Sequence, residues 1–251
     1  MSNSIIFGVA RIFREPLFTI FMVDFTEHFM DQAQWTAVDS YFTDLLLEPD
    51  PSLDTVLAHS EQAQLPAINV APNQGKFLYL LALMKGARRI LEIGTLGGYS
   101  TIWLARALPE HGKLVSLEVN EAYASLAAQN IALAGQSGKV EIRVGSALDS
   151  LRKMVEHSEA PFDLIFIDAD KEHNPQYLEL SLALSRAGTV IIGDNVVRKG
   201  EVVNASSNDP SVRGVQRFCE LMATSPRLTA TAVQTVGSKG WDGFSLAVVT
   251  S

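Results

Sequence analysis

The 251-residue sequence contains almost no cysteine, which removes two classes of structure. Cys219 stands alone, so the chain has no intrachain disulfide and no cysteine-based metal site. Basic side chains are also in deficit, with 20 Lys and Arg against 28 Asp and Glu and a net charge of -8 at pH 7. We therefore expect no general nucleic-acid partner, because such binding needs a basic surface. A single cysteine suits a reducing compartment, and we expect the protein in the cytoplasm.

Long apolar runs are missing as well. No stretch has the length and apolarity of a membrane span, so we expect no membrane partner. Two apolar runs, 5–9 and 16–23, are too short for a signal peptide, and no small-residue cleavage site follows them. Residues 1–34 are either an amphipathic arm that packs on a partner subunit or an upstream extension, since Met22 and Met30 are both plausible starts.

Length and composition suit one large α/β domain over residues 35–251, with 47% hydrophobic and 19% charged residues. Strand-like and helix-like segments alternate from Arg89 onward, which is typical of a doubly wound parallel sheet. The predicted strands are 89–93, 114–118, 140–144, 164–167 and 189–193. The predicted helices between them are 100–108, 121–134, 147–157 and 176–185.

Further elements precede and follow this alternation. The predicted upstream helices are 35–47, 52–64 with Ser52 as cap, and 74–84, which Asn73 caps and Gly86 ends. A last helix, 212–224, is followed by the predicted strands 230–236 and 244–250. Their linker, 237–243, is so short that the two strands must be antiparallel.

The most informative stretch is 88–100. The buried strand 89–93 leads into Gly94, Gly97 and Gly98, and then into a helix with Ser100 close to its N-cap. A glycine turn at this place lets the backbone approach a ligand closely, and the N-terminus of the helix attracts negative groups. Glu92 is a carboxylate at the end of a buried strand, so it needs a positively charged or donor-rich partner.

The spacing of these glycines argues against a dinucleotide. The dinucleotide pattern G-x-G-x-x-G has a second glycine where this chain has Leu96. An acid followed by Gly-x-x-Gly-Gly instead resembles the first motif of S-adenosylmethionine (SAM) methyltransferases. Glu118 ends the next strand, where a ribose diol is held in such folds, although NAD enzymes also have an acid there. A simple α/β turn without a ligand is the remaining alternative.

Polar residues also follow two later strands. Asp168 ends the fourth strand, and Asp194 and Asn195 end the fifth. Ligands of doubly wound folds bind at these carboxyl ends, so the three side chains can converge. Oxygen ligands without His or Cys suit Mg²⁺, Mn²⁺ or Ca²⁺. The alternative is that Asp168 and Asp194 cap the helices that follow them.

Together these motifs resemble one known family. Segments 91–100, 167–171 and 194–195 are similar to the cation-dependent class I O-methyltransferases, the caffeoyl-CoA and catechol O-methyltransferase group and its bacterial members in particular. The similarity extends over about residues 35–250. It implies a Rossmann-like, seven-stranded sheet of order 3-2-1-4-5-7-6 with an antiparallel last strand, and it implies a homodimer.

The resemblance also implies roles for individual residues. The divalent cation, most simply Mg²⁺, would be held by Asp168, Asp194 and Asn195. SAM would be held by the Val70 backbone, Glu92, Gly94, Ser100, Glu118 at the ribose, Ala147 at the adenine, Asp168, and Asp170 at the amine. Lys171 would be the general base beside Asp168, and His173 is a rival base.

The implied reaction moves a methyl group from SAM to a hydroxyl of a vicinal diphenol, which is a small phenolic molecule. The chain departs from plant relatives at Arg198 and Lys199, where two cations replace an aromatic residue and an Asn. This departure suggests an acceptor with an acidic group, and Trp241 could stack on its ring. Two other functions stay open: an inactive SAM-binding protein and an NAD-dependent oxidoreductase.

Overall fold

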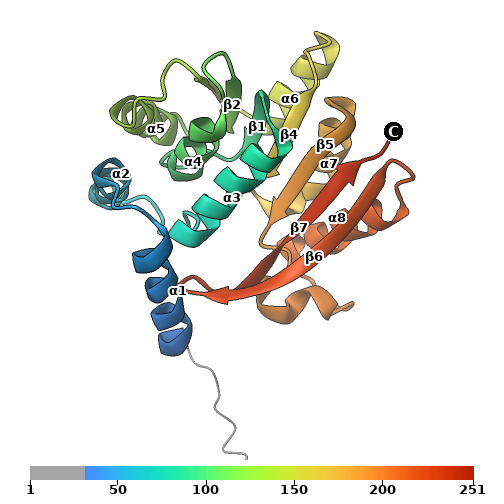
Figure 1. Cartoon of the computed structure of the whole chain (residues 1–251). Coiled ribbons are helices and arrows are strands. Elements are labelled where there is room, and N and C mark those ends of the chain that lie inside the picture. Colours follow the sequence, from blue (N-terminus) through green and yellow to red (C-terminus); the bar gives the residue numbers. More distant parts are fainter. Residues whose placement is uncertain (1–31) are drawn as a thin grey trace, which may run out of the picture. The chain divides into compact units, whose positions relative to one another are not determined.

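A computed structural model describes residues 32–251, and their centre is a seven-stranded sheet (Figure 1). The strand order is β3-β2-β1-β4-β5-β7-β6, and β7 runs antiparallel to both of its neighbours. The predicted fold class and strand order are therefore confirmed. The strands are β1 (Arg89–Ile93), β2 (Lys113–Glu118), β3 (Val140–Val144), β4 (Phe162–Ile167), β5 (Ser185–Asp194), β6 (Leu228–Gly237) and β7 (Gly240–Val249).

Helices cover both faces of this sheet. Successive strand residues point to opposite faces. Ile90 belongs to a buried cluster with side chains of α2, α3, α4 and α5, and Leu91 belongs to a second cluster with side chains of α6, α7 and α8. Both side chains are fully buried. The helices are α1 (Gln32–Leu46), α2 (Pro51–Gln62), α3 (Pro72–Lys85), α4 (Tyr99–Ala107), α5 (Glu121–Leu133), α6 (Ala147–Glu156), α7 (Asn174–Ala183) and α8 (Pro210–Thr224).

Two predicted helix caps are wrong. The cap of α2 is Asp50, not Ser52, and its carboxylate accepts the Ser52 and Leu53 N–H groups. Helix α3 starts at Pro72, because proline has the helical φ already fixed and needs no donor at the first position. Asn73 therefore lies inside this helix rather than at its cap. The predicted end of α3 is confirmed, since Gly86 adopts the left-handed conformation there.

The last two strands are longer than predicted. Residues 237–243 are not a loop, because Ser238 and Lys239 alone join β6 to β7. Trp241 consequently lies in β7, opposite Val236. Two short 3-10 helices were also not predicted: η1 (Lys171–His173), and η2 (Arg198–Val203), which follows β5.

Helix α1 lies against the tip of this hairpin. The Gln32 amide donates to the Gly237 carbonyl at 2.9 Å, and the Ser238 N–H donates to Asp39 at 2.7 Å. The predicted arm or extension falls largely on residues 1–31, outside the described part of the chain. Within residues 32–251, no helix is long and apolar enough to cross a membrane.

Candidate functional site

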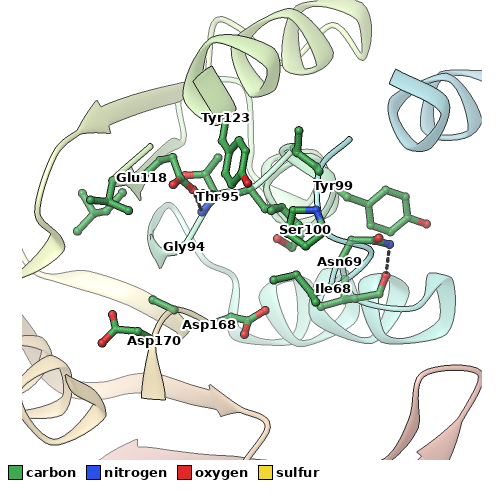
Figure 2. Close-up of a pocket in the computed structure, with 18 of the residues that line it drawn as sticks. Ile68, Asn69, Gly94, Thr95, Tyr99, Ser100, Glu118, Tyr123, Asp168 and Asp170 are labelled. Carbon is green, nitrogen blue, oxygen red and sulfur yellow. Dashed lines mark hydrogen bonds between the residues drawn. The ribbon is translucent and has the colours of Figure 1, made fainter. Parts of the chain in front are cut away.

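A cavity of about 970 Å³ lies where four neighbouring strands end. Its wall contains the residues that follow or end β1, β2, β4 and β5, namely Gly94, Glu118, Asp168 and Asn195. Figure 2 shows Asp168 and Asp170 across the cavity from Glu118. The other predicted site residues in the wall are Val70, Ser100, Ala147, Asp170 and Lys171. Glu92 and Asp194 lie outside this wall.

The turn after β1 requires glycine. Gly94 has φ +101°, and a Cβ there would lie 2.1 Å from the Asp168 carbonyl oxygen. The turn after β1 therefore lies directly against the turn after β4. Gly97 is packed against Ser60 of α2, so this helix covers the turn from the other side. These contacts bring the glycine motif and the acidic motif, 74 residues apart, to one place.

Glu92 lies beneath the turn and is fully buried. Its carboxylate accepts hydrogen bonds from the hydroxyls of Ser100 at 2.6 Å, Ser116 at 2.6 Å and Thr101. These are the donor-rich partners that the sequence predicted for this acid. Burial raises the pKa of Glu92 to about 7 in spite of the three hydroxyls. Only Ser100 among these partners reaches the cavity wall, so Glu92 orients its hydroxyl.

Glu118 holds the same turn from β2. One carboxylate oxygen accepts the N–H groups of Thr95 at 3.2 Å and Leu96 at 2.8 Å, and the other accepts the Asn120 N–H at 2.9 Å. Figure 2 shows the Thr95 contact at the cavity edge. The N–H groups of the turn are thus satisfied by a neighbouring strand. Glu118 therefore fixes the shape of the turn, and this role is separate from the binding of a ligand.

The acidic cluster joins the ends of β4 and β5. Asp194 is buried, and it accepts the Gln74 amide at 2.8 Å and the Asn195 N–H at 2.8 Å. Burial and the negative charge of Asp168 together raise the pKa of Asp194 to about 7. The helices that follow have Asp170, His173 and Val197 at their N-caps. The alternative that Asp168 and Asp194 are helix caps is therefore wrong.

The donor chemistry of this cluster fits a hard divalent cation. Among residues 32–251, no group of three His, Cys, Asp or Glu side chains could hold a metal ion, so the set rests on two carboxylates and the Asn195 amide. The Asp168 Oδ1 accepts the Lys171 ammonium at 2.8 Å, which leaves its Oδ2 without a hydrogen bond from the described residues. Oxygen ligands of this kind are the ones Mg²⁺ prefers.

Lys171 is buried, and its side chain is only 7% exposed. A lysine at the start of a helix usually lies on the surface, but Lys171, the first residue of η1, does not. The rival base, His173, instead contacts the Asp170 carboxylate through its Nδ1. The Tyr177 hydroxyl donates to the same carboxylate at 2.6 Å. Asp170 therefore presents a hydrogen-bonded carboxylate, with a lowered pKa, to the cavity.

Some functional residues could not be found from the sequence. Gln74 lies 120 residues before Asp194, and no local pattern connects them. The same holds for Asn130, whose amide donates to the Gly97 carbonyl at 2.9 Å while its oxygen contacts His59. The contact of Tyr177 could have been predicted from the sequence, because Tyr177 lies seven residues after Asp170 and therefore on the same side of a helical segment.

Known proteins resemble this chain over most of its length. A model of the O-methyltransferase family matches residues 48–247. The chain is 46% identical over 220 residues to a catechol O-methyltransferase of Niastella koreensis, covering 88% of this chain and 100% of that protein. It is 49% identical over 212 residues to a catechol O-methyltransferase of Mycobacterium tuberculosis, covering 84% and 94%.

Solved structures agree with this result. An O-methyltransferase of Bacillus cereus in complex with SAH superposes with a TM-score of 0.87 at 57% identity, covering 88% of this chain and 100% of that one. An O-methyltransferase of Streptomyces achromogenes in complex with SAM gives 0.86 at 48% identity, covering 88% and 100%. The resemblance predicted from the motifs is thus confirmed, and the chain belongs to the O-methyltransferase family.

Proposed function

We propose that the protein transfers a methyl group from SAM to a hydroxyl of a vicinal diphenol and that the transfer depends on a divalent cation. One observation carries the proposal. A single cavity has the glycine turn on one side and Asp168, Asn195 and the buried Lys171 on another. The chain would therefore have a place for a methyl donor and a place for an oxygen acceptor within one cavity.

The donor side would be formed by the turn after β1. Ser100, fixed by Glu92, and the wall residues Val70 and Gly94 would bind the methionyl part of SAM. Glu118 would hold the ribose, Ala147 the adenine and Asp170 the amine, since these residues line the same cavity. The relatives from Bacillus cereus and Streptomyces achromogenes, solved with SAH and SAM, support this assignment.

The acceptor side would hold the cation through Asp168, Asp194 and Asn195. A divalent cation at this cluster would supply a positive charge that favours the deprotonated form of an acceptor hydroxyl. Gln74 orients Asp194 from α3, and the Asn195 N–H orients it from its own strand end. Lys171, held beside Asp168, would accept the proton of that hydroxyl. The walls of the cavity would align the oxygen with the methyl group.

Two earlier alternatives fit less well. An inactive SAM-binding protein would have no need for a buried Lys171 beside Asp168. An NAD-dependent oxidoreductase is not the activity of the family to which the chain belongs. We also propose a homodimer and, because the lone half-buried Cys219 suits a reducing compartment, a cytoplasmic location.

The test is methyl transfer by the full-length protein. Catechol and isotope-labelled SAM are incubated with untreated enzyme, with EDTA-treated enzyme, and with EDTA-treated enzyme given excess Mg²⁺ or Mn²⁺. We expect EDTA to abolish transfer and either cation to restore it. Full activity in the chelated, metal-free enzyme would contradict the cation dependence, and no transfer to any vicinal diphenol would contradict the acceptor class.

A variant tests whether the cation binds at the acidic cluster. Asp194→Ala should lose both activity and its response to added cation, while calorimetry still detects SAM binding. Asp149→Ala, at an exposed position paired with Arg152 on α6, is the matched control and should behave as wild type. Loss of SAM affinity in Asp194→Ala as complete as the loss of activity would contradict this assignment.

A further inference from the structure

Arg198 differs from the other cationic side chains of the cavity wall in its lack of a partner. Lys171 is paired with Asp168, and His173 contacts Asp170. None of the ion pairs within residues 32–251 involves Arg198. Its Nε is buried and donates no hydrogen bond to any described residue. A guanidinium in the cavity wall without a counter-ion among the described residues favours a negative group supplied from outside the chain.

The backbone that carries Arg198 is held from two sides. The Asp242 carboxylate of β7 accepts the N–H groups of Val197 at 2.9 Å and Arg198 at 3.1 Å. The Gln216 amide of α8 donates to the Val202 carbonyl at 2.9 Å. These contacts fix η2 between the last strand and the last helix. The guanidinium is therefore presented to the cavity from a defined place, three residues after the predicted cation ligand Asn195.

Trp241 belongs to this support and not to the cavity. Its ring packs over Gly200, where an added Cβ would lie 2.8 Å from the ring. The indole N–H donates to Gln234 at 3.1 Å within the hairpin. Trp241 is absent from the cavity wall. The ring therefore braces η2, and of the two residues only Arg198 lines the cavity.

We propose that Arg198 binds a carboxylate carried by the methyl acceptor, so that the preferred acceptors are vicinal diphenols bearing an acidic group. This inference rests on the proposed function and specifies its acceptor. A guanidinium is planar and pairs with a carboxylate through two parallel hydrogen bonds. It would thereby give the guanidinium the counter-ion that no ion pair among residues 32–251 supplies. Lys199 is exposed and is not part of the wall, so it serves as the matched control.

Binding measured without turnover tests the inference directly. Enzyme loaded with SAH and Mg²⁺ is titrated by calorimetry with 3,4-dihydroxybenzoate and with its methyl ester, which keeps the diphenol and removes the charge. Wild type should bind the acid about ten- to a hundredfold more tightly than the ester. Arg198→Ala should remove this preference by weakening the acid alone, Arg198→Lys should keep part of it, and Lys199→Ala should keep all of it.

Three results would overturn the inference. The first is equal affinity of wild type for acid and ester, and the second is an equal loss for both ligands in a folded Arg198→Ala. The third is a loss of SAH or SAM affinity in Arg198→Ala, which would assign the guanidinium to the methyl donor. Turnover is measured in parallel with both acceptors. If the acid binds through Arg198 but no diphenol is methylated, the proposed function fails, and only the carboxylate site at Arg198 stands.

Discussion

Lys171 is buried, and burying a charged lysine costs free energy unless a partner offsets the loss of hydration. It has a partner in Asp168, and it lies in the wall of the cavity. A buried ion pair by itself adds little to stability, so a chemical role at the cavity explains its presence better than stability does. The proposed chemistry is removal of the proton from the acceptor hydroxyl.

We therefore expect Lys171→Ala to lower turnover by about 10²–10⁴-fold, the usual contribution of a general base. The defect should shrink with acceptors whose phenols are more acidic, because they lose the proton more readily. Lys171→Arg keeps the positive charge beside Asp168 but cannot accept a proton, so it should be slow as well. Near wild-type turnover in Lys171→Ala would leave the lysine a positioning role and make His173 or solvent the base.

Glu92 predicts a pH dependence of stability that can be tested in the absence of ligands. Its pKa rises from the ordinary 4.5 to about 7 in the folded protein. Between these values the folded state binds more protons than the unfolded state, so the free energy of unfolding falls as pH rises. The loss from this group is at most about 3 kcal/mol. Below pH 4.5 and above pH 7 Glu92 adds no slope.

We expect Glu92→Gln to reduce the decline in stability between about pH 4.5 and pH 7, measured by urea unfolding at several pH values. The amide has no proton to lose in this pH range, while Asp194, whose pKa is also raised, keeps its own share of the slope. The comparison concerns the slope alone, since the substitution also changes the hydrogen bonds with Ser100, Thr101 and Ser116. An unchanged slope in Glu92→Gln would show that Glu92 is already ionised near pH 5 in the folded state.

At the scale of elements, the junction between the β1 turn and the β4 turn connects the two halves of the site. We expect Gly94→Ala to destabilise the protein by about 2–5 kcal/mol, because it combines a strained positive φ with a collision against the Asp168 carbonyl. Gly135→Ala is the matched control. It has φ +70° with nothing within 4 Å, so we expect a loss of about 1 kcal/mol.

Urea unfolding measures both costs, and calorimetry with SAM reports on the site. Gly94→Ala should also weaken SAM binding, since the turn moves with the colliding backbone. Equal stabilities for the two variants would mean that the β4 turn shifts to make room for the added Cβ at little cost in free energy. The connection between the glycine motif and the acidic motif would then be loose.

Elements defined by buried apolar runs were predictable, and elements defined by distant contacts were not. The bounds of β1 and β3 are as predicted, because each is a short apolar or β-branched segment between turns. Strand β5 begins at Ser185, four residues before the prediction, since Ser185 pairs with Phe162 across an irregular register. Its polar start gives no such signal in the sequence.

The same distinction holds for the site. The cavity-wall residues at strand ends could be predicted, because ligands of doubly wound folds bind where the parallel strands end, at one edge of the sheet. The partners of Glu92 are close in sequence or on the next strand, and the demand for donors was predictable. Gln74 and Asn130 act through tertiary packing, which a sequence read in order does not contain. Arg198 was singled out from the sequence, but its lack of an ion-pair partner depends on the same packing.

At the scale of the whole molecule, helix α1 presents an apolar face without a covering element among residues 32–251. It has no buried residue, and Tyr41 and Leu45 are 62% and 63% exposed. Val38, Phe42 and Leu46 are exposed as well. An apolar patch of this kind on a folded protein usually marks an interface, and a closed pair of identical chains is the commonest solution.

We accordingly expect light scattering at micromolar concentration to give twice the mass of one chain. The double variant Tyr41→Glu with Leu45→Glu should shift the protein towards the monomer, because a charge buried in an apolar interface loses its hydration. Leu133→Glu is the control, since Leu133 is 50% exposed at the end of α5, away from α1 in the sequence. It should stay dimeric. A wild-type protein with the mass of one chain would contradict the homodimer. A double variant that stays dimeric would show that the interface lies on a surface other than α1.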